Sequence, residues 1–191
     1  MSSDFLSNPG EADKFSLIYA DAQKNIGPAG VSIVLIRDGV VPAGTKELPA
    51  FLDYRRQIEA HSNLNTPPVF AIYVVLLVTR WLLNDVGGVE KMGEINRVKA
   101  DLLYSILDNS DDFYHSWAAP EHRSDMNVAF TLPTKEIEAA FFEETRAADF
   151  SRLEGHRAIG GVRASIYNAL SVTAVEKLAE FKQDFQRRHR K

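Results

Sequence analysis

Cysteine is absent from the 191-residue sequence. The chain therefore has no disulfide bonds and no thiolate ligands for a metal. Positive charge is also scarce: 22 Lys and Arg residues stand against 26 Asp and Glu residues, giving a formal net charge of −4. Proteins that bind nucleic acid through its phosphates need clustered cations. The one strongly basic run, residues 187–191, fits a solvated helix C-terminus, so we expect no nucleic-acid partner.

Long hydrophobic runs are missing as well. The longest, residues 69–78, has ten apolar residues, whereas a helix needs roughly 20 to span a bilayer. Residues 1–14 are polar and acidic and lack the basic-then-apolar order of a signal peptide. The residues that are present, 45% hydrophobic and 25% charged, are typical of a globular chain. These features predict a cytoplasmic protein without a membrane partner.

Short β-branched runs open the chain. Residues 15–20 and 31–36 are predicted as two buried strands joined by a glycine-rich turn. Residues 37–65 are rich in turn formers, which predicts loops and short irregular elements. Because a sheet of two strands is marginal by itself, this part either docks on the rest of the chain or belongs to a larger sheet.

The pattern becomes helical at Thr66. Thr66 is predicted as the N-cap, Pro67 as the first helical residue, and Gly87 with Gly88 as the stop of one helix. This helix is apolar on nearly every side, so we expect it to be buried between layers.

Beyond residue 88 the sequence predicts helices and strands around a second core. Strands are predicted over residues 126–132 and 163–170, and a helix over residues 134–148. Thr173 and Glu176 form a capping box that opens a last helix. Two sets of apolar residues recur at helical spacing and are predicted to face the core: Met92, Ile95, Val98, Leu102 and Ile106 in one helix, and Val175, Leu178, Phe181 and Phe185 in the other. The fold class is therefore α/β.

Lys24 follows a strand-like run and precedes a tight turn through Gly27, Pro28 and Gly30. A lysine at a strand end ordinarily extends its ammonium group into water. The alternative is a lysine held in a pocket, with a pKa lowered by burial or by nearby cations, where the amine forms an imine with a carbonyl and moves protons. The turn beside the amine favours the second interpretation, although a lone Lys-Asn-x-Gly pattern is weak evidence.

Two arginines bracket a glycine turn near the end of the chain. His156 and Arg157 precede Gly160 and Gly161, and Arg163 follows them. Arginines bind carboxylate or phosphate through paired hydrogen bonds, so these guanidinium groups can converge on one small dianion. The alternative is two surface arginines at a hairpin.

Asn65 and Thr66 stand at the start of the apolar helix, where free backbone N–H groups attract phosphate. Helix capping explains these two residues equally well. His61, His115 and His122 lack the spacing of metal ligands, so no metal site is predicted.

Taken together, these segments resemble the C-terminal half of the phosphoserine aminotransferase family, which are pyridoxal-phosphate-dependent enzymes with the aspartate-aminotransferase fold. The matching segments occur in the family's order and cover essentially the whole chain: "MSSDFLS", "IYADAQKNIGPAG", "NTPPVFAIY", "DNSDDFY", "MNVAF" and "GHRAIGGVRASIYNA".

The resemblance implies a role for each cofactor residue. Lys24 matches the lysine that forms the internal aldimine with pyridoxal phosphate and moves the proton between Cα and C4′. Gln23 matches a residue that contacts the cofactor phosphate. Asn65 and Thr66 match the pair that reaches across a homodimer interface to the phosphate in the neighbouring subunit.

The resemblance also implies the substrates. Arg163 matches the arginine that holds the substrate α-carboxylate, and His156 and Arg157 match residues that bind the substrate's phosphate or the distal carboxylate of glutamate. The implied reaction moves the amino group of L-glutamate to 3-phosphohydroxypyruvate, giving 2-oxoglutarate and O-phospho-L-serine in serine biosynthesis.

Two domains are implied: residues 1–65 as the C-terminal piece of a large cofactor-binding domain, and residues 66–191 as a connecting helix with a small α+β domain. Family chains are about twice as long, and their first half, which carries the aspartate partner of the pyridine nitrogen, has no counterpart here. The alternative expectation is a catalytically incompetent fragment, or a split half that needs the missing part. Asp21 stands where the family usually has glycine.

Overall fold

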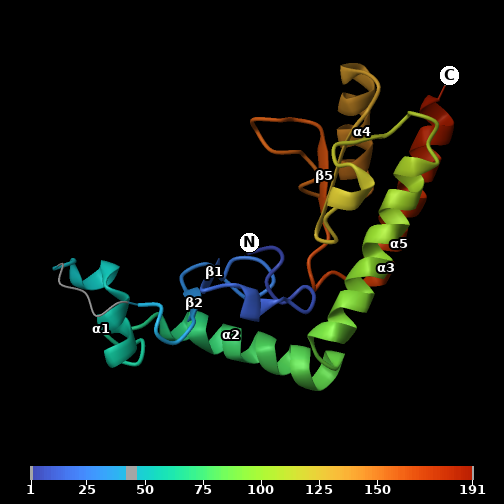
Figure 1. Cartoon of the computed structure of the whole chain (residues 1–191). Helices are drawn as coiled ribbons and strands as arrows, with labels where there is room; N and C mark the ends of the chain where they lie inside the picture. Colours follow the sequence, from blue (N-terminus) through green and yellow to red (C-terminus); the bar gives the residue numbers. More distant parts are fainter. Residues whose placement is uncertain (1, 42–46, 191) are drawn as a thin grey trace.

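The computed structural model describes residues 2–41 and 47–190. Met1 of the first matching segment, residues 42–46 of the predicted loop region and Lys191 of the basic run lie outside the described residues. Figure 1 shows two long helices, α2 and α3, that meet at a bend, with a small sheet over α2 and a second layer of helix and sheet beside α3.

The first part of the chain contains a small sheet, short helices and one long helix. In chain order its elements are a 3-10 helix (Ala12–Lys14), β1 (Leu17–Asp21), β2 (Ser32–Ile36), a 3-10 helix (Ala50–Leu52), α1 (Tyr54–Glu59), α2 (Val69–Trp81) and a π-helical turn (Leu82–Val86).

The two predicted strands are confirmed as an antiparallel pair, with Leu17 of β1 opposite Ile36 of β2. Their predicted burial is wrong for most of their length. Ala20 is buried, but Tyr19 and Leu35 are 52% and 47% exposed. The pair has no third strand beside it in the described residues, so the outer edge of each strand is unpaired.

Helix α2 begins at Val69, and Pro68 occupies the N-cap position without a side-chain hydrogen bond. The prediction of Thr66 as the N-cap is therefore wrong. The physical reason is that Pro67, the predicted first helical residue, precedes Pro68, and a residue before proline is kept out of the helical region. The predicted stop is confirmed at Gly87, which has the left-handed φ of 97° that glycine adopts easily.

The predicted burial of α2 is also wrong. Among the described residues of α2 and its π-helical turn, Ala71 and Leu82 are buried, whereas Phe70 is 75% exposed. By length and composition, residues 69–86 form one helix that is apolar enough to cross a membrane, and 11% of it is buried. The outer side of α2 is exposed because no other described element covers it.

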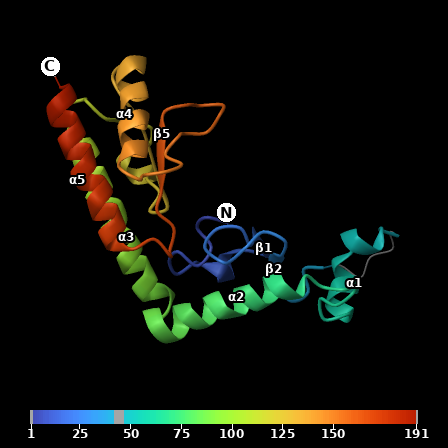
Figure 2. The ribbon, with the colours of Figure 1, turned by 180° about the vertical axis from the view of Figure 1, so that it is seen from behind.

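The second part of the chain is longer and better packed. Its elements are α3 (Val89–Asp108), β3 (His115–Ser116), a 3-10 helix (Pro120–His122), β4 (Asn127–Thr131), α4 (Lys135–Ala147), β5 (Val162–Ser165) and α5 (Val172–His189). Strands β3, β4 and β5 form an antiparallel sheet in that order. Helices α3 and α5 lie side by side in Figure 1 and in the opposite view of Figure 2.

The predicted apolar face of α3 is partly wrong. Met92 and Ile106 are buried, but Val98 is 51% exposed. Asn96 and Lys99 take buried positions instead, because their side chains are hydrogen-bonded to main chain carbonyls of other segments.

The other predicted elements are confirmed with different boundaries. The strand predicted over residues 163–170 ends at Ser165, and the helix predicted over residues 134–148 is α4, whose N-cap Thr134 accepts a hydrogen bond from the Ile137 N–H. Helix α5 begins two residues earlier than predicted, because Ser171 rather than Thr173 accepts the capping hydrogen bond, from the Ala174 N–H.

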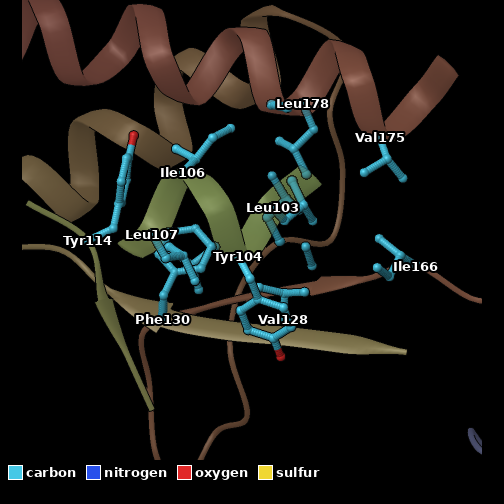
Figure 3. Close-up of a cluster of buried hydrophobic side chains, with 14 of the residues drawn as sticks. Leu103, Tyr104, Ile106, Leu107, Tyr114, Val128, Phe130, Ile166, Val175 and Leu178 are labelled. Carbon is cyan, nitrogen blue, oxygen red and sulfur yellow. The ribbon is translucent and has the colours of Figure 1, made fainter. Parts of the chain in front are cut away.

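A core of apolar side chains fills the space between α3, α5 and the β3-β4-β5 sheet, as Figure 3 shows. The predicted stripe of α5 is confirmed, since Val175, Leu178 and Phe185 are buried. Aromatic rings meet edge to face in this core: the ring centroids of Phe141 and Phe185 are 5.1 Å apart at 89°. This core holds β5 and the loops beside it in place.

Candidate functional site

Lys24 lies in the loop between β1 and β2. The loop is closed at its base, where the Ala22 N–H donates to the Val31 carbonyl at 2.8 Å, and Ala22 and Ile26 are buried anchors. Gly27 lies against α2, because a Cβ at that position would be 3.5 Å from a methyl group of Val75. Lys24 itself remains exposed, so the loop presents its amine outward from a fixed base.

A cavity of about 520 Å³ opens beside Lys24. Its walls come from the Lys24 loop, from α2 and from the segment after β5, and they consist of Lys24, Asn25, Gly27, Leu77, Val78, Trp81, Asn168 and Ala169. The Lys24 Nζ is 5.8 Å from the centroid of the Tyr167 ring, within the range of a cation–π contact. The structure therefore places Lys24 next to Tyr167, near the end of the segment that carries Arg163.

Arg163 is half-buried on β5, opposite Ala129 of β4. Its N–H donates to the Leu153 carbonyl at 2.7 Å, which fixes the backbone of the residue. Its side-chain Nε is buried and has no hydrogen-bond partner among the described residues. Buried donors are usually paired, so this guanidinium group has capacity to bind an acceptor. It is not among the residues that line the Lys24 cavity.

His156 and Arg157 are exposed on the loop that precedes β5. The loop is pinched at its base, where the Gly155 N–H donates to the Gly161 carbonyl at 2.8 Å. A Cβ at Gly155 would lie 2.0 Å from the Gly160 carbonyl oxygen, so the close approach requires glycine. The predicted glycine turn is thus confirmed, and the loop that it closes carries the exposed side chains of His156 and Arg157.

Asn65 and Thr66 are exposed before α2, and the Asn65 amide donates to the Thr66 carbonyl at 3.1 Å. Asn65 lines a second cavity of about 650 Å³ between β2, α1 and the start of α2. Lys24 lies near Val78, which is nine residues along α2 from its start at Val69 and therefore roughly 14 Å of helix away at 1.5 Å per residue. Within one chain, Asn65 and Thr66 are therefore not brought to Lys24.

Gln23 is exposed next to Lys24. Asp21, at the end of β1, is accommodated by the sheet: its carboxylate accepts a hydrogen bond from the Ser32 hydroxyl, and its N–H donates to the Ser2 hydroxyl at 3.2 Å. The Asp21 carboxylate is therefore hydrogen-bonded to β2.

Sequence reasoning missed Asn25, Trp81, Tyr167 and Asn168, which surround Lys24. Only their positions in the sequence could have indicated a role at the site. Asn25 is adjacent to Lys24, and Tyr167 and Asn168 lie at the end of the segment that carries Arg163.

Two further lysines are buried outside this cavity. Lys99 donates to the carbonyls of Ile166, Tyr167 and Leu170 at 2.9–3.1 Å, and burial lowers its pKa to about 8. Lys182 is fully buried, and the loss of water around the ammonium lowers its pKa to about 7.

Comparison with known proteins gives a consistent result. Residues 1–178 match the family described as Aminotransferase class-V. The phosphoserine aminotransferase of Desulfosudis oleivorans is 47% identical, with 98% of this chain and 52% of the relative covered, and that of Desulfotalea psychrophila is 52% identical, with 97% and 51% covered. The chain spans about half the length of these curated relatives.

Solved structures agree with the fold. The phosphoserine aminotransferase from Bacillus circulans subsp. alkalophilus aligns with a TM-score of 0.94 at 43% identity, over 98% of this chain and 52% of that one. A PLP-bound phosphoserine aminotransferase from Trichomonas vaginalis aligns with a TM-score of 0.87 at 36% identity, over 96% and 52%. The predicted fold class and family resemblance are confirmed, and the apolar helix α2 is part of this fold.

Proposed function

The chain belongs to the class-V aminotransferase family, and from that premise we propose that it is the lysine-bearing part of a cytoplasmic phosphoserine aminotransferase. The reaction moves the amino group of L-glutamate to 3-phosphohydroxypyruvate, with 2-oxoglutarate and O-phospho-L-serine as products. The observation that carries this proposal is the amine of Lys24 beside a cavity, on a loop anchored against α2 and the segment after β5.

The residues present fit pyridoxal phosphate as the cofactor. Lys24 offers an exposed primary amine to the cofactor's aldehyde, and Gln23 beside it offers an amide to the phosphate. When bound, the cofactor supplies a ring that withdraws electrons from the substrate's Cα. With the cofactor bound, the Lys24 amine would act as the general base and acid for the proton at the substrate's Cα.

Substrate anions are bound by Arg163 of β5 and by His156 and Arg157 of the loop that precedes it. Arg163 binds the α-carboxylate, and its buried Nε–H, which has no partner among the described residues, is one of the donors. His156 and Arg157, exposed on the glycine-pinched loop, bind the phosphate of one substrate and the distal carboxylate of the other. The two ends of a doubly anionic substrate thereby have separate cationic partners.

A homodimer completes the phosphate site in this proposal. Asn65 and Thr66 precede α2, and roughly 14 Å of helix separates its start from the Lys24 cavity near Val78, so they serve the cofactor of a neighbouring subunit. The corresponding division of the chain is residues 1–65 as part of the cofactor domain and residues 66–191 as the connecting helix and small domain.

Borohydride trapping tests the cofactor role directly. The chain is incubated with pyridoxal phosphate, reduced, and digested for mass spectrometry. We expect the pyridoxyl mass on the peptide containing Lys24. The Lys24→Ala variant should lose this adduct, and Lys14→Ala, which removes an exposed lysine paired with Glu11, should keep it. Equal labelling of all exposed lysines would contradict the proposal.

A second candidate function is that of a split half, inactive until it meets the complementary part. The exposed apolar side of α2 and the two-stranded β1-β2 sheet favour it, because both lack a covering layer in the described chain. The two candidates share one site and differ in whether this chain is active alone.

A further inference from the structure

Three buried asparagines connect separate parts of the chain. Asn25 follows Lys24, Asn96 lies on α3, and Asn168 follows β5; they are 6%, 1% and 6% exposed. Asparagine is seldom fully buried, and a buried amide must find hydrogen bonds to offset the loss of water. These three side chains find most of theirs in one another and in the first residues of the chain.

The asparagines form a continuous relay. The Asn168 N–H donates to the Asn25 Oδ1 at 3.0 Å, and the Asn96 Nδ2 donates to the Asn168 Oδ1 at 2.9 Å. The first of these bonds joins residues 143 positions apart. A hydrogen-bonded path therefore runs from the Lys24 loop through the segment after β5 to α3.

Residues 3–7, which we call the N-terminal strap, brace each member of the relay. Asn25 donates to the Ser3 carbonyl at 2.6 Å, and Asn168 donates to the Leu6 carbonyl at 2.8 Å. Asn96 donates to the Ser7 carbonyl at 2.8 Å. Each amide thus binds at least one strap carbonyl as well as its neighbour in the relay, and Asn25 also donates to the Phe5 carbonyl at 3.4 Å.

Lys99, one turn after Asn96, completes the assembly. Its ammonium group has three donors and binds three carbonyls of residues 166–170. A fully buried cation with all its donors used holds that segment in a single conformation. The backbone around Tyr167 and Asn168 is therefore fixed from α3.

The relay connects the residues that flank the proposed site. Lys24 directly precedes Asn25, and Tyr167, whose ring is 5.8 Å from the Lys24 Nζ, directly precedes Asn168. We propose that the relay of Asn25, Asn168 and Asn96 is a positioning device that holds the Lys24 loop at a fixed distance from the β5 segment carrying Arg163. The role of the relay in catalysis rests on the proposed function, whereas its hydrogen bonds are observed independently of that function.

The absence of cysteine allows a direct test in the full chain. Ala29→Cys in the Lys24 loop and Glu180→Cys on α5, both at exposed positions, are spin-labelled and their separation is measured by pulsed electron paramagnetic resonance. We expect one narrow distance distribution. Adding Asn25→Ala should broaden or split it, whereas the matched Asn109→Ala, which removes an exposed amide bound to Ser105, should leave it unchanged.

An unchanged distribution in folded Asn25→Ala would overturn the proposal. If that variant does not fold, Asn96→Ala tests the proposal instead. This substitution breaks the relay at α3 without changing the Lys24 loop, and it should broaden the same distance distribution. Amide hydrogen exchange of the unmutated chain tests the relay without any substitution. The Asn168 N–H should exchange as slowly as that of Val128 in the core, and exchange at the rate of exposed loops would overturn the relay.

Trapping at Lys24 gives the functional readout. We expect pyridoxal phosphate to be trapped about tenfold more slowly in Asn25→Ala than in the parent, at a temperature where both are folded, because a displaced amine meets the aldehyde less often in the correct geometry. Failure of trapping in the parent chain would remove the proposed function and leave the distance measurement as the test of the relay.

Discussion

Lys182 is the residue whose environment is least expected from its type. Its Nζ is fully buried, has no hydrogen-bond partner among the described residues, and lies 4.7 Å and 4.2 Å from the ring centroids of Tyr114 and Phe130. Aromatic faces attract a cation but replace only part of its lost hydration. The burial that lowers its pKa to about 7 also raises that of the neighbouring Tyr114 phenol, so the phenol stays neutral.

Lys182 predicts a pH dependence of stability. Between pH 7 and 10.5 the folded chain carries a neutral amine and the unfolded chain a charged one, so unfolding takes up a proton and stability rises with pH. Below pH 7 both forms are charged and the full destabilising effect is present. The slope in this window is at most about 1.4 kcal/mol per pH unit.

Urea unfolding at pH 7, 8 and 9 measures this effect. The free energy of unfolding of the parent should rise toward that of Lys182→Met, which replaces the ammonium with an apolar group of similar length. Other titrating groups cancel in the difference between the two proteins. A difference that stays constant with pH would rule out titration of Lys182 in this window.

Gly155 carries a second prediction at this scale. A Cβ there would overlap the Gly160 carbonyl oxygen at 2.0 Å, so Gly155→Ala should open the loop that bears His156 and Arg157 and cost about 1–3 kcal/mol. Gly10→Ala is the control, because nothing lies within 4 Å of its added Cβ. Thermal unfolding of both variants checks this, and equal midpoints would contradict it.

Among the elements, helix starts depart most from the sequence patterns. Thr66 and Thr173 both have the residue type of an N-cap, yet neither caps a helix. Prolines displace the start of α2, and at α5 the serine two positions earlier is the one that accepts the Ala174 N–H. A capping pattern therefore locates a helix to within a turn, and the path of the preceding chain selects the residue.

The start of α5 gives a matched pair of variants. Ser171→Ala removes the hydroxyl that accepts the Ala174 N–H and should cost about 1 kcal/mol of stability. Thr173→Ala, inside the first turn, should change stability by only a few tenths of a kcal/mol. Chemical denaturation of the two proteins compares them directly. A larger loss in Thr173→Ala would show that the capping box operates after all.

At the scale of the whole molecule, apolar side chains are well buried in one part of the chain and exposed in the other. The second part of the chain encloses its own core, while α2 and the β1-β2 sheet expose large apolar side chains such as Phe70 and Tyr19. Exposed apolar surface on this scale marks an interface. The curated relatives have about twice this length.

Complementation tests this interpretation. The chain is co-expressed with the first half of a relative such as the Desulfosudis oleivorans protein, and we expect a one-to-one complex that binds less of a hydrophobic dye than the chain alone. Phe70→Glu with Tyr73→Glu, on one face of α2, should weaken the complex, and Val98→Glu, exposed on α3, should not. Equal effects of these variants would place the interface elsewhere.

Local patterns in the sequence determined the identity of most elements: the paired strands around the Lys24 loop, α4 behind Thr134 and the apolar stripe of α5. Each depends on residues within one or two turns of each other, where periodicity and capping act directly. The same patterns, joined to a family resemblance, selected Lys24 and Arg163 as candidates.

Only the tertiary structure decided which polar groups are buried and which apolar groups are not. The bond between Asn25 and Asn168 spans 143 positions, and no local pattern encodes it. Lys99 and Lys182 are buried because distant segments pack over them, and most of α2 is exposed because no described segment covers it. Burial is a property of what the rest of the chain places against a residue, whereas secondary structure follows largely from the residue's neighbours in sequence.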